Sequence, residues 1–272
     1  MIPGLTTRNE TRLLGALDSG VTDLTQADFA TRDFTILGGF SDEARRLGFI
    51  ATGPIEPTIV VTDPDRPVGR VTVQAMARDP LLFLDNGAGV VQADIRLLGN
   101  DAVVFFNGVG DGFVGLTTLF LRAHDQFFFW GAMATAVELS VEVEGVGQGV
   151  VIGDDALIAG EVWIRNHDMH SMHDLATGRM LTRPPVTTVL ERHVWLGQGA
   201  LLLGCDRVGA GAIVGARSIV KRPLPPCVAA VGSPARIVRE QVSWGRSAEG
   251  MTGAERLSLG FPEVAGATAA PG

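Results

Sequence analysis

The most constraining feature of this 272-residue sequence is a strict six-residue repeat toward its C-terminal end. Aliphatic residues recur at every sixth position, at Leu190, Leu196, Leu202, Val208, Val214 and Val220. Mostly small residues follow four positions later, at Val194, Ala200, Asp206, Ala212, Ser218 and Leu224. A helix repeats apolar residues every three or four positions and a strand every two, so neither explains a period of six. A coil with three flat faces does, with one inward aliphatic residue on each face and a small residue or glycine at each corner.

Three repeats complete one turn of the coil, so Leu190 is expected to stack beneath Val208. The same period occurs at Ile152, Ile158 and Ile164, and a spacing of 23 separates Phe83, Phe106, Phe129 and Ile152. The longer spacing predicts upstream coils that each carry a loop of about five extra residues at one corner. These loops are expected around residues 99–101, 123–125 and 145–147. A β-sandwich with irregular strands is the alternative, but it does not produce the register after residue 190.

The rest of the chain lacks this register. Residues 1–75 are predicted to form a mixed α/β N-terminal cap, because the terminal coil of such a structure must be covered. Within this region Ser41 is expected to cap a short helix, and strands are expected at residues 58–62 and 71–73. The coil itself is predicted over residues 76–239. Residues 240–272 are expected to be partly disordered, since the tail becomes rich in Ala, Gly and Ser. The predicted fold class is therefore all-β, a parallel β-helix with a cap and a flexible tail.

Charge and composition limit the possible ligands. The formal net charge is -8 and no basic cluster is present, which argues against nucleic acid as a partner. Lys221 is the single lysine among 22 basic residues, so an anionic ligand must be bound by a few local arginines. Two cysteines are too few for a disulfide framework and are expected to be reduced. The sequence shows neither a signal-peptide pattern nor a membrane-spanning apolar run, which predicts a cytoplasmic protein.

The six-residue repeat is interrupted between Ile164 and Leu190, where the interval is 26. The extra residues predict a long loop, placed at 169–189, and long loops on rigid scaffolds often carry function. The interval between Ile164 and Leu190 contains His167, His170 and His173. A neutral imidazole could act as a general base toward a hydroxyl group. Alternatively, the three histidines could bind a metal, or the loop could carry no chemistry.

Several segments resemble the hexapeptide-repeat acyltransferases, and among these the sugar and capsular-polysaccharide O-acetyltransferases. They are Asp-Met-His-Ser at 168–171, Asp174 with Thr177-Gly178, His-Val-Trp-Leu-Gly at 193–197, Val-Gly-Ala-Arg-Ser-Ile-Val at 214–220 and Gly-Ser-Pro-Ala-Arg at 232–236. The resemblance is specific over residues 152–244, roughly a third of the chain.

The resemblance implies a left-handed β-helix, a homotrimer with active sites between subunits, acetyl-CoA as the acyl donor and no metal. It places the general base on His170, with Asp168 or Asp174 orienting its ring, and Trp195 beside the thioester and the acceptor. The residues that it assigns to coenzyme A are Gly197, Gly215, Ala216, Lys221, Arg236 and Arg239. The expected activity is transfer of an acyl group to a hydroxyl of a sugar, polysaccharide or small molecule. Arg183 and Glu191 depart from the family pattern near the expected acceptor side, so the acceptor stays open.

Other interpretations remain at this point. Trp195 could simply cover a corner of the coil, and the basic residues could be solvated surface charges. An N-acyltransferase acting on an amino sugar would share the donor site. A zinc enzyme of the γ-carbonic anhydrase type would share the β-helix, although its wide histidine separation is missing here. A non-catalytic β-helix would keep only the repeat. Product analysis, metal analysis and coenzyme A binding separate these possibilities.

Overall fold

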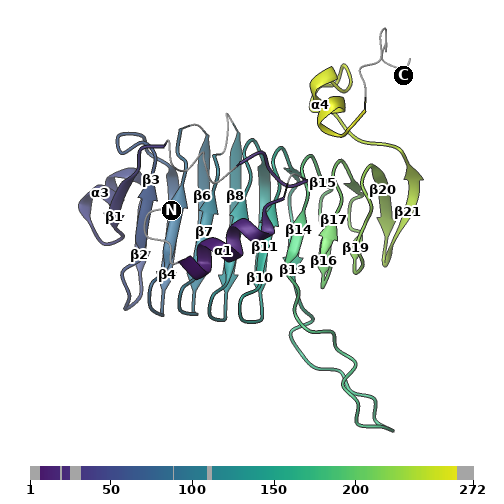
Figure 1. Cartoon of the computed structure of the whole chain (residues 1–272), viewed down its shortest axis with the longest axis horizontal. Coiled ribbons are helices and arrows are strands. Elements are labelled where there is room, and N and C mark those ends of the chain that lie inside the picture. Colours follow the sequence, from purple (N-terminus) through teal and green to yellow (C-terminus); the bar gives the residue numbers. More distant parts are fainter. Residues whose placement is uncertain (1–6, 19, 25–31, 88, 109–111, 262–272) are drawn as a thin grey trace.

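The computed structural model describes residues 7–18, 20–24, 32–87, 89–108 and 112–261, most of which form an elongated stack of parallel β-coils (Figure 1). The strands lie on three faces of a prism. Face 1 consists of β3 (Thr58–Val61), β5 (Leu81–Leu84), β7 (Val103–Phe106), β9 (Phe127–Trp130), β11 (Gly149–Ile152), β14 (Thr188–Leu190) and β17 (Arg207–Val208). Each of these strands pairs in parallel with the next, so the face runs along the whole stack.

The other two faces form one continuous sheet. Face 2 consists of β2 (Phe49–Thr52), β4 (Gly69–Ala75), β6 (Val90–Leu97), β8 (Phe113–Leu121), β10 (Thr135–Val143), β12 (Leu157–Ile158), β15 (Trp195–Leu196), β18 (Ile213–Val214) and β20 (Val228–Gly232). Face 3 consists of β13 (Val162–Arg165), β16 (Leu201–Leu203) and β19 (Ile219–Val220). The start of β10 pairs with β12 and its end pairs with β13. Long upstream strands therefore give way to two short strands in each downstream coil.

The downstream coils confirm the six-residue register. Leu190 pairs with Val208, one turn farther along the chain, and Leu196 and Leu202 pair in the same way with Val214 and Val220. All six aliphatic residues of the repeat are at most 1% exposed. They belong to one continuous core that runs through the prism. The repeat thus places one inward side chain on each face, as predicted.

The upstream coils do not follow the predicted even spacing. Phe83 pairs with Phe105 rather than Phe106, and Phe105 pairs with Phe129, so one interval is shorter and the next is longer than predicted. Phe106 points into the prism core, whereas Phe83, Phe105 and Phe129 belong to a second cluster on the other side of face 1. Their rings form a ladder with centroid separations of 4.1 and 5.6 Å. Because both sides of these strands are apolar, their sequence does not alternate, and an average spacing was mistaken for the register.

One corner of the prism carries the added loops, as predicted. The connections back to face 1 pass through residues 98–102 after β6, 122–126 after β8 and 144–148 after β10. The end of β10 pairs with β13, and the long loop between β13 and β14 leaves at the same corner. The corners are less restricted to small residues than the repeat suggested. Asp101, Asp125 and Arg217 adopt left-handed backbone conformations with φ of 57°, 59° and 57°. Asp visits this region at modest cost, so glycine is not required at each corner.

The N-terminal region differs from the cap that was predicted over residues 1–75. Parallel pairing already begins between β2 and β4, so the coil starts near residue 49. The cap proper consists of β1 (Thr35–Gly38) and α3 (Asp42–Leu47), and Ser41 caps α3 by accepting a hydrogen bond from the Ala44 amide, as predicted. The helix α1 (Thr7–Ala16) instead lies along face 1 (Figure 1). Its Leu13 joins the phenylalanine ladder in the second core cluster.

The described part of the C-terminal segment contains a strand and a helix. After β20 the chain folds back into the antiparallel strand β21 (Ala235–Glu240) and ends its described part with α4 (Gly253–Ser258). Thr252 and Glu255 form a reciprocal capping box at the start of α4. Trp244 is only 7% exposed, so part of the segment at residues 240–272 is packed against the coil. Residues 262–272 of the predicted tail lie outside the described residues. None of the described helices is long and apolar enough to cross a membrane.

Candidate active-site groove

The long loop of residues 166–187 is held at its base by a buried amide. The side chain of Asn166 donates to the carbonyl oxygens of Glu144 and Val186, at 2.8 and 2.9 Å, and accepts from the Glu144 amide at 2.8 Å. Asn166 is 1% exposed, so all of these bonds are shielded from water. The Asn166 side chain therefore joins the two ends of the loop to the neighbouring coil. Its role was not evident from the sequence, because both of its partners are remote from it along the chain, one on either side.

The tip of the loop is a tight turn built by Asp174. The Asp174 carboxylate accepts hydrogen bonds from the amides of Ala176 and Thr177 and from the Thr177 hydroxyl. The Thr177 bonds hold the pKa of Asp174 below its ordinary value. His173 forms an antiparallel bridge with Met180 across the turn. Asp174 therefore caps its own turn. The structure does not bring it to the His170 ring, although one of the two predicted arrangements, in which Asp174 orients that ring, required such a contact.

His170 stands exposed on the loop. Its amide donates to the Asp168 carbonyl oxygen at 2.9 Å, and its carbonyl oxygen accepts from the Thr182 hydroxyl at 3.3 Å. Its imidazole has no hydrogen-bond partner among the described residues. The Asp168 carboxylate lies 3.6 Å from the ammonium group of Lys221, so it faces the coil rather than the ring. The loop thus fixes the backbone of His170 and leaves both ring nitrogens free.

A groove of about 720 Å³ lies between the base of this loop, the corner after β19 and the start of β21. It brings together His167 and Asp168 from the loop and two of the predicted coenzyme A residues, Lys221 and Arg236. The charged residues that line it are Asp168, Arg183, Lys221, Arg222 and Arg236. Four cations face one carboxylate, although the protein as a whole carries a net charge of -8. Such a groove suits a phosphorylated ligand. The contribution of Arg222 was missed by the sequence analysis.

The other predicted donor-site residues do not line this groove. Arg239 lies farther along β21 and pairs with Ala229. Gly197, Gly215 and Ala216 lie at corners of stacked coils on face 2. A Cβ atom on Gly197 would lie 2.7 Å from the Ala216 amide nitrogen, and one on Gly215 would lie 2.6 Å from the Val231 side chain. Both glycines are therefore required by close packing between coils.

Trp195 lies outside the groove as well. It is on β15 of face 2, where it pairs with Leu157 and Ile213, and it is 37% exposed. The corner from which the His170 loop leaves is the corner between faces 3 and 1, which in a three-sided prism lies opposite face 2. Trp195 and the loop of one chain therefore lie on opposite sides of the coil. The ring of Trp195 contacts that of Trp244, with centroids 6.3 Å apart.

Residues 241–261 form a clasp, the C-terminal clasp, which docks around a second histidine. His193 is 1% exposed and hydrogen-bonds through Nδ1 to the Asp155 carboxylate at 2.6 Å and through Nε2 to the Trp244 carbonyl oxygen at 2.8 Å. Its ring stacks on Trp244 at 4.2 Å, and Arg246 donates to Asp155 at 2.5 Å. Burial by itself lowers the pKa of His193, but the bonds to Asp155 and Trp244 outweigh it, so the pKa is raised. A ring with two acceptors is a protonated ring with two donors.

Possible metal ligands also gather in this cluster, since ligand atoms of Asp155, His193 and Glu255 lie within 4.8 Å of one another. Both ring nitrogens of His193 are already bonded within the protein, and the Arg246 guanidinium occupies the carboxylate of Asp155. This geometry fits an ion-pair network and not a set of metal ligands. Within the described part of the chain, the three loop histidines do not converge into a ligand cluster either.

The two residues that depart from the family pattern, Arg183 and Glu191, lie in different places in the structure. Arg183 lines the groove. Glu191 does not: it bonds Arg207 and accepts from the Ala210 amide, and Arg207 also pairs with Asp18 of the N-terminal segment. Glu191 therefore lies away from the groove lining, bonded within the protein. The glutamate helps to hold the N-terminal segment against face 1.

Comparison with known proteins identifies several that are similar to this chain. A scan against protein families finds no match. Galactoside O-acetyltransferase of Escherichia coli (strain K12) is 34% identical over 93 residues, which cover 34% of this chain and 44% of that protein. Polysialic acid O-acetyltransferase of Neisseria meningitidis is 28% identical over 166 residues, covering 61% of this chain and 75% of that protein. The relatives that this chain matches are acetyltransferases.

A solved structure of such an acetyltransferase supports the fold. The polysialic-acid-specific acetyltransferase NeuO superposes with a TM-score of 0.51 at 20% identity, covering 78% of this chain and 90% of that one. The parallel coil described above thus has the left-handed β-helix fold, as the resemblance implied. The chain spans about a third to a half of the length of several of the acetyltransferases that it matches, among them serine acetyltransferases.

Proposed function

We propose that the protein transfers an acetyl group from acetyl-CoA to a hydroxyl group of a carbohydrate. The observation that carries the proposal is the groove beside the histidine loop, where four cations gather on an otherwise acidic protein. Lys221, Arg222 and Arg236 would meet the phosphates of coenzyme A through charge-assisted hydrogen bonds. The relatives that act on galactosides and on polysialic acid support a carbohydrate as the acceptor.

His170 is the general base in this proposal. Its free imidazole takes the proton of the acceptor hydroxyl while the hydroxyl oxygen attacks the thioester carbonyl carbon. A new ester bond forms, the carbon–sulfur bond breaks, and the proton passes from His170 to the departing thiolate of coenzyme A. The attack is direct, because burial raises the pKa of Cys205 to about 12 and that of Cys227 also rises. Neither thiol suits a covalent acyl intermediate.

The active site would be completed by a second copy of the chain. The His170 loop leaves one corner of the prism, and Trp195 lies on the opposite face, so the two meet only if the loop of one subunit reaches face 2 of its neighbour. Threefold closure provides three identical contacts of this kind. Trp195 would then lie beside the thioester and the acceptor that His170 of the neighbour activates. Asp168, which faces Lys221, would order the base of the loop in the same site.

The decisive experiment measures thioester cleavage from acetyl-CoA against a panel of neutral sugars, acidic oligosaccharides, amino sugars and small alcohols. We expect acceptor-dependent release of coenzyme A with carbohydrates, and an O-acetyl ester in the product by mass spectrometry. An amide product would assign N-acyl transfer instead. Absence of coenzyme A binding would sink the proposal altogether.

The assembly is tested separately by light scattering at micromolar concentration. A homotrimer has three times the chain mass of 28.7 kDa. A monomeric mass would remove the shared active site, because Trp195 and His170 would then stay on opposite sides of one coil.

A further inference from the structure

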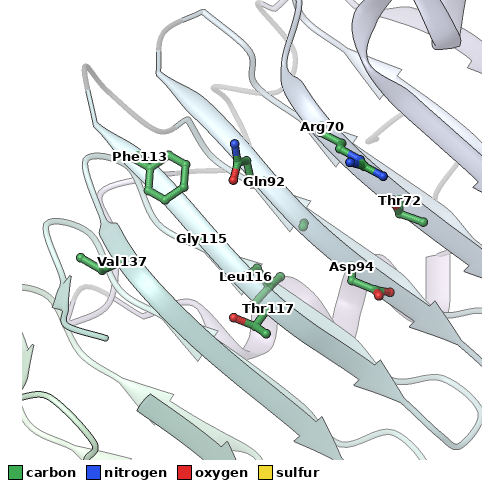
Figure 2. Close-up of a pocket in the computed structure, with 10 residues that line it drawn as sticks. Arg70, Thr72, Gln92, Asp94, Phe113, Gly115, Leu116, Thr117 and Val137 are labelled. Atoms are coloured by element: carbon green, nitrogen blue, oxygen red, sulfur yellow. The ribbon is translucent and has the colours of Figure 1, made fainter. Parts of the chain in front are cut away.

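A second groove lies on the outside of face 2, away from the histidine loop. It has a volume of about 440 Å³ and is formed by the upstream strands β4, β6, β8 and β10. Figure 2 shows Arg70, Gln92 and Phe113 standing out from three successive strands, with Thr72 and Asp94 farther along the same strands. No function proposed above uses these residues.

The hollow exists because the sheet is irregular at this point. The register between β6 and β8 shifts between Ala93 and Ile95, and that between β8 and β10 shifts just beyond Ala136. Bulges of this kind redirect side chains and often border binding sites. The floor of the groove is Gly115, where a Cβ atom would lie 2.2 Å from the Val137 carbonyl oxygen and 3.0 Å from the Phe113 ring. The groove thus depends on a bare backbone beside an aromatic ring.

The groove offers polar groups that no other described residue occupies. The side chains of Arg70, Gln92 and Thr72 make no hydrogen bond to any other described residue, whereas Asp94 pairs with Arg96 at 3.5 Å. Phe113 is 39% exposed and presents an apolar ring next to these donors and acceptors. A sugar ring has the matching surface, with hydroxyl groups at its edge and an apolar face. A guanidinium group without a partner adds preference for a carboxylate on that sugar.

The groove shares a row of side chains with Trp195. Phe113 and Thr135 precede the paired residues Val114 and Ala136, Thr135 pairs with Leu157, and Leu157 pairs with Trp195. Three strand-to-strand steps therefore separate Phe113 from Trp195, or roughly 14 Å at the usual spacing of strands. A chain of sugar units lying along face 2 would reach from one aromatic ring to the other.

We propose that this groove is a remote subsite for an acidic oligosaccharide chain, which it holds while another unit of the same chain reaches Trp195. The proposal rests on the proposed function for the identity of the acceptor site, but glycan binding in the groove can be measured without any acyl donor. Nucleic acid fits less well, because the groove presents a single arginine beside Asp94.

The test compares a short and a long acidic oligosaccharide of the same composition, with neutral oligomers of matched length, by calorimetry. Phe113→Ala and Arg70→Gln are each expected to weaken binding of the long acidic oligomer by about tenfold. They should leave the disaccharide, the KM for acetyl-CoA and kcat with the short acceptor unchanged. Phe40→Ala is the matched control, since Phe40 is 37% exposed on a different part of the surface.

Wild-type affinity of both variants for the long oligomer would overturn the subsite. An equal loss for short and long acceptors would also overturn it, because the groove would then not act at a distance. A fall in the mass measured by light scattering would reassign this face to a contact between copies of the chain. If the long oligomer binds through Phe113 and Arg70 but no carbohydrate is acylated, the subsite stands and the proposed reaction fails.

Discussion

The loop of residues 166–187 leaves the regular coil and the C-terminal clasp docks against it, yet the histidine of the loop and the histidine beneath the clasp have opposite surroundings. His170 is exposed, and its imidazole has no partner among the described residues. His193 is 1% exposed, and both of its ring nitrogens are bonded. A general base needs a free nitrogen to accept a proton, whereas a ring with two bonded nitrogens can only hold structure. The surroundings of the two rings therefore give His170 and His193 different chemical properties, although the family resemblance places them in neighbouring motifs.

The largest effect is expected from removing the free histidine. His170→Ala should lower kcat by roughly 10² to 10⁴, the usual contribution of a positioned proton acceptor. The melting temperature, the oligomeric mass and the affinity for acetyl-CoA should stay close to wild type, because the side chain packs against nothing in the core. Steady-state thioester cleavage measures the first, and calorimetry and light scattering measure the others.

His173→Ala serves as the control for this prediction. His173 lies on the same loop, but its ring bonds only the neighbouring Ser171 hydroxyl, so turnover should stay near that of the wild type. Normal turnover in the His170 variant would remove the general base from that position. Activity lost to a chelator and restored by zinc would support the metal interpretation instead.

Replacing His193 should lower the stability of the protein, whereas replacing His170 should lower its turnover. His193→Ala deletes two hydrogen bonds and a ring stack, and leaves the Asp155 carboxylate without one of its partners. We expect the free energy of unfolding to fall by roughly 2–4 kcal/mol, since partly buried charged groups are costly to leave unpaired. Chemical denaturation at fixed protein concentration measures this loss. His124→Ala should cost far less, because that ring lies on an exposed corner and accepts one bond from the Asn100 amide.

The pH dependence of the clasp sharpens the same contrast. The pKa of His193 is raised above 6.5, so its stabilising charge is fully present below that pH and is lost as pH rises through the raised value. Burial raises the pKa of Asp155, but bonds from His193 and Arg246 outweigh it and hold it below 3.8, so its contribution is fully present above 3.8. The difference in unfolding free energy between wild type and His193→Gln should therefore be greatest between pH 3.8 and 6.5. A difference that grows as pH rises above 6.5 would contradict the protonated ring.

The sequence predicted the loop and missed the clasp for a physical reason. A break in a strict repeat is a local signal, and the turn at Asp174 is built from residues that are neighbours in the chain. The clasp depends on contacts between His193 and Trp244, and between Asp155 and Arg246, which are 51 and 91 residues apart. Nothing in the composition of the tail reveals such contacts. Its glycine- and alanine-rich end suggested disorder instead.

The downstream and upstream coils differ in the same way, because only the downstream register is visible in the local sequence. From β15 to β19 each short strand buries one aliphatic side chain, so the six-residue period is visible in the sequence. Upstream, face 1 is covered by the core on one side and by α1 on the other, so its strands are apolar throughout. The fold class could be predicted from the first region, but the alternation of shorter and longer coils could not be predicted from the second. For the groove, Lys221 and Arg236 were found by resemblance, whereas Arg222 depended on the shape of the corner.

The smallest expected effect concerns β21, the strand that connects the groove to the clasp. Arg236 lines the groove, whereas Arg239 lies on the same strand outside its lining. Arg236→Ala should raise the KM for acetyl-CoA by about tenfold, the effect of losing one charge-assisted contact to phosphate, and the increase should shrink at high salt. Arg239→Ala should change this KM much less, although the resemblance assigned both residues to the donor. If Arg239→Ala has the larger effect, or if the KM for the acceptor rises instead, the donor does not lie in this groove. The cations of this groove would then bind the acceptor. The acceptor would approach the His170 imidazole from the side opposite to the one proposed above.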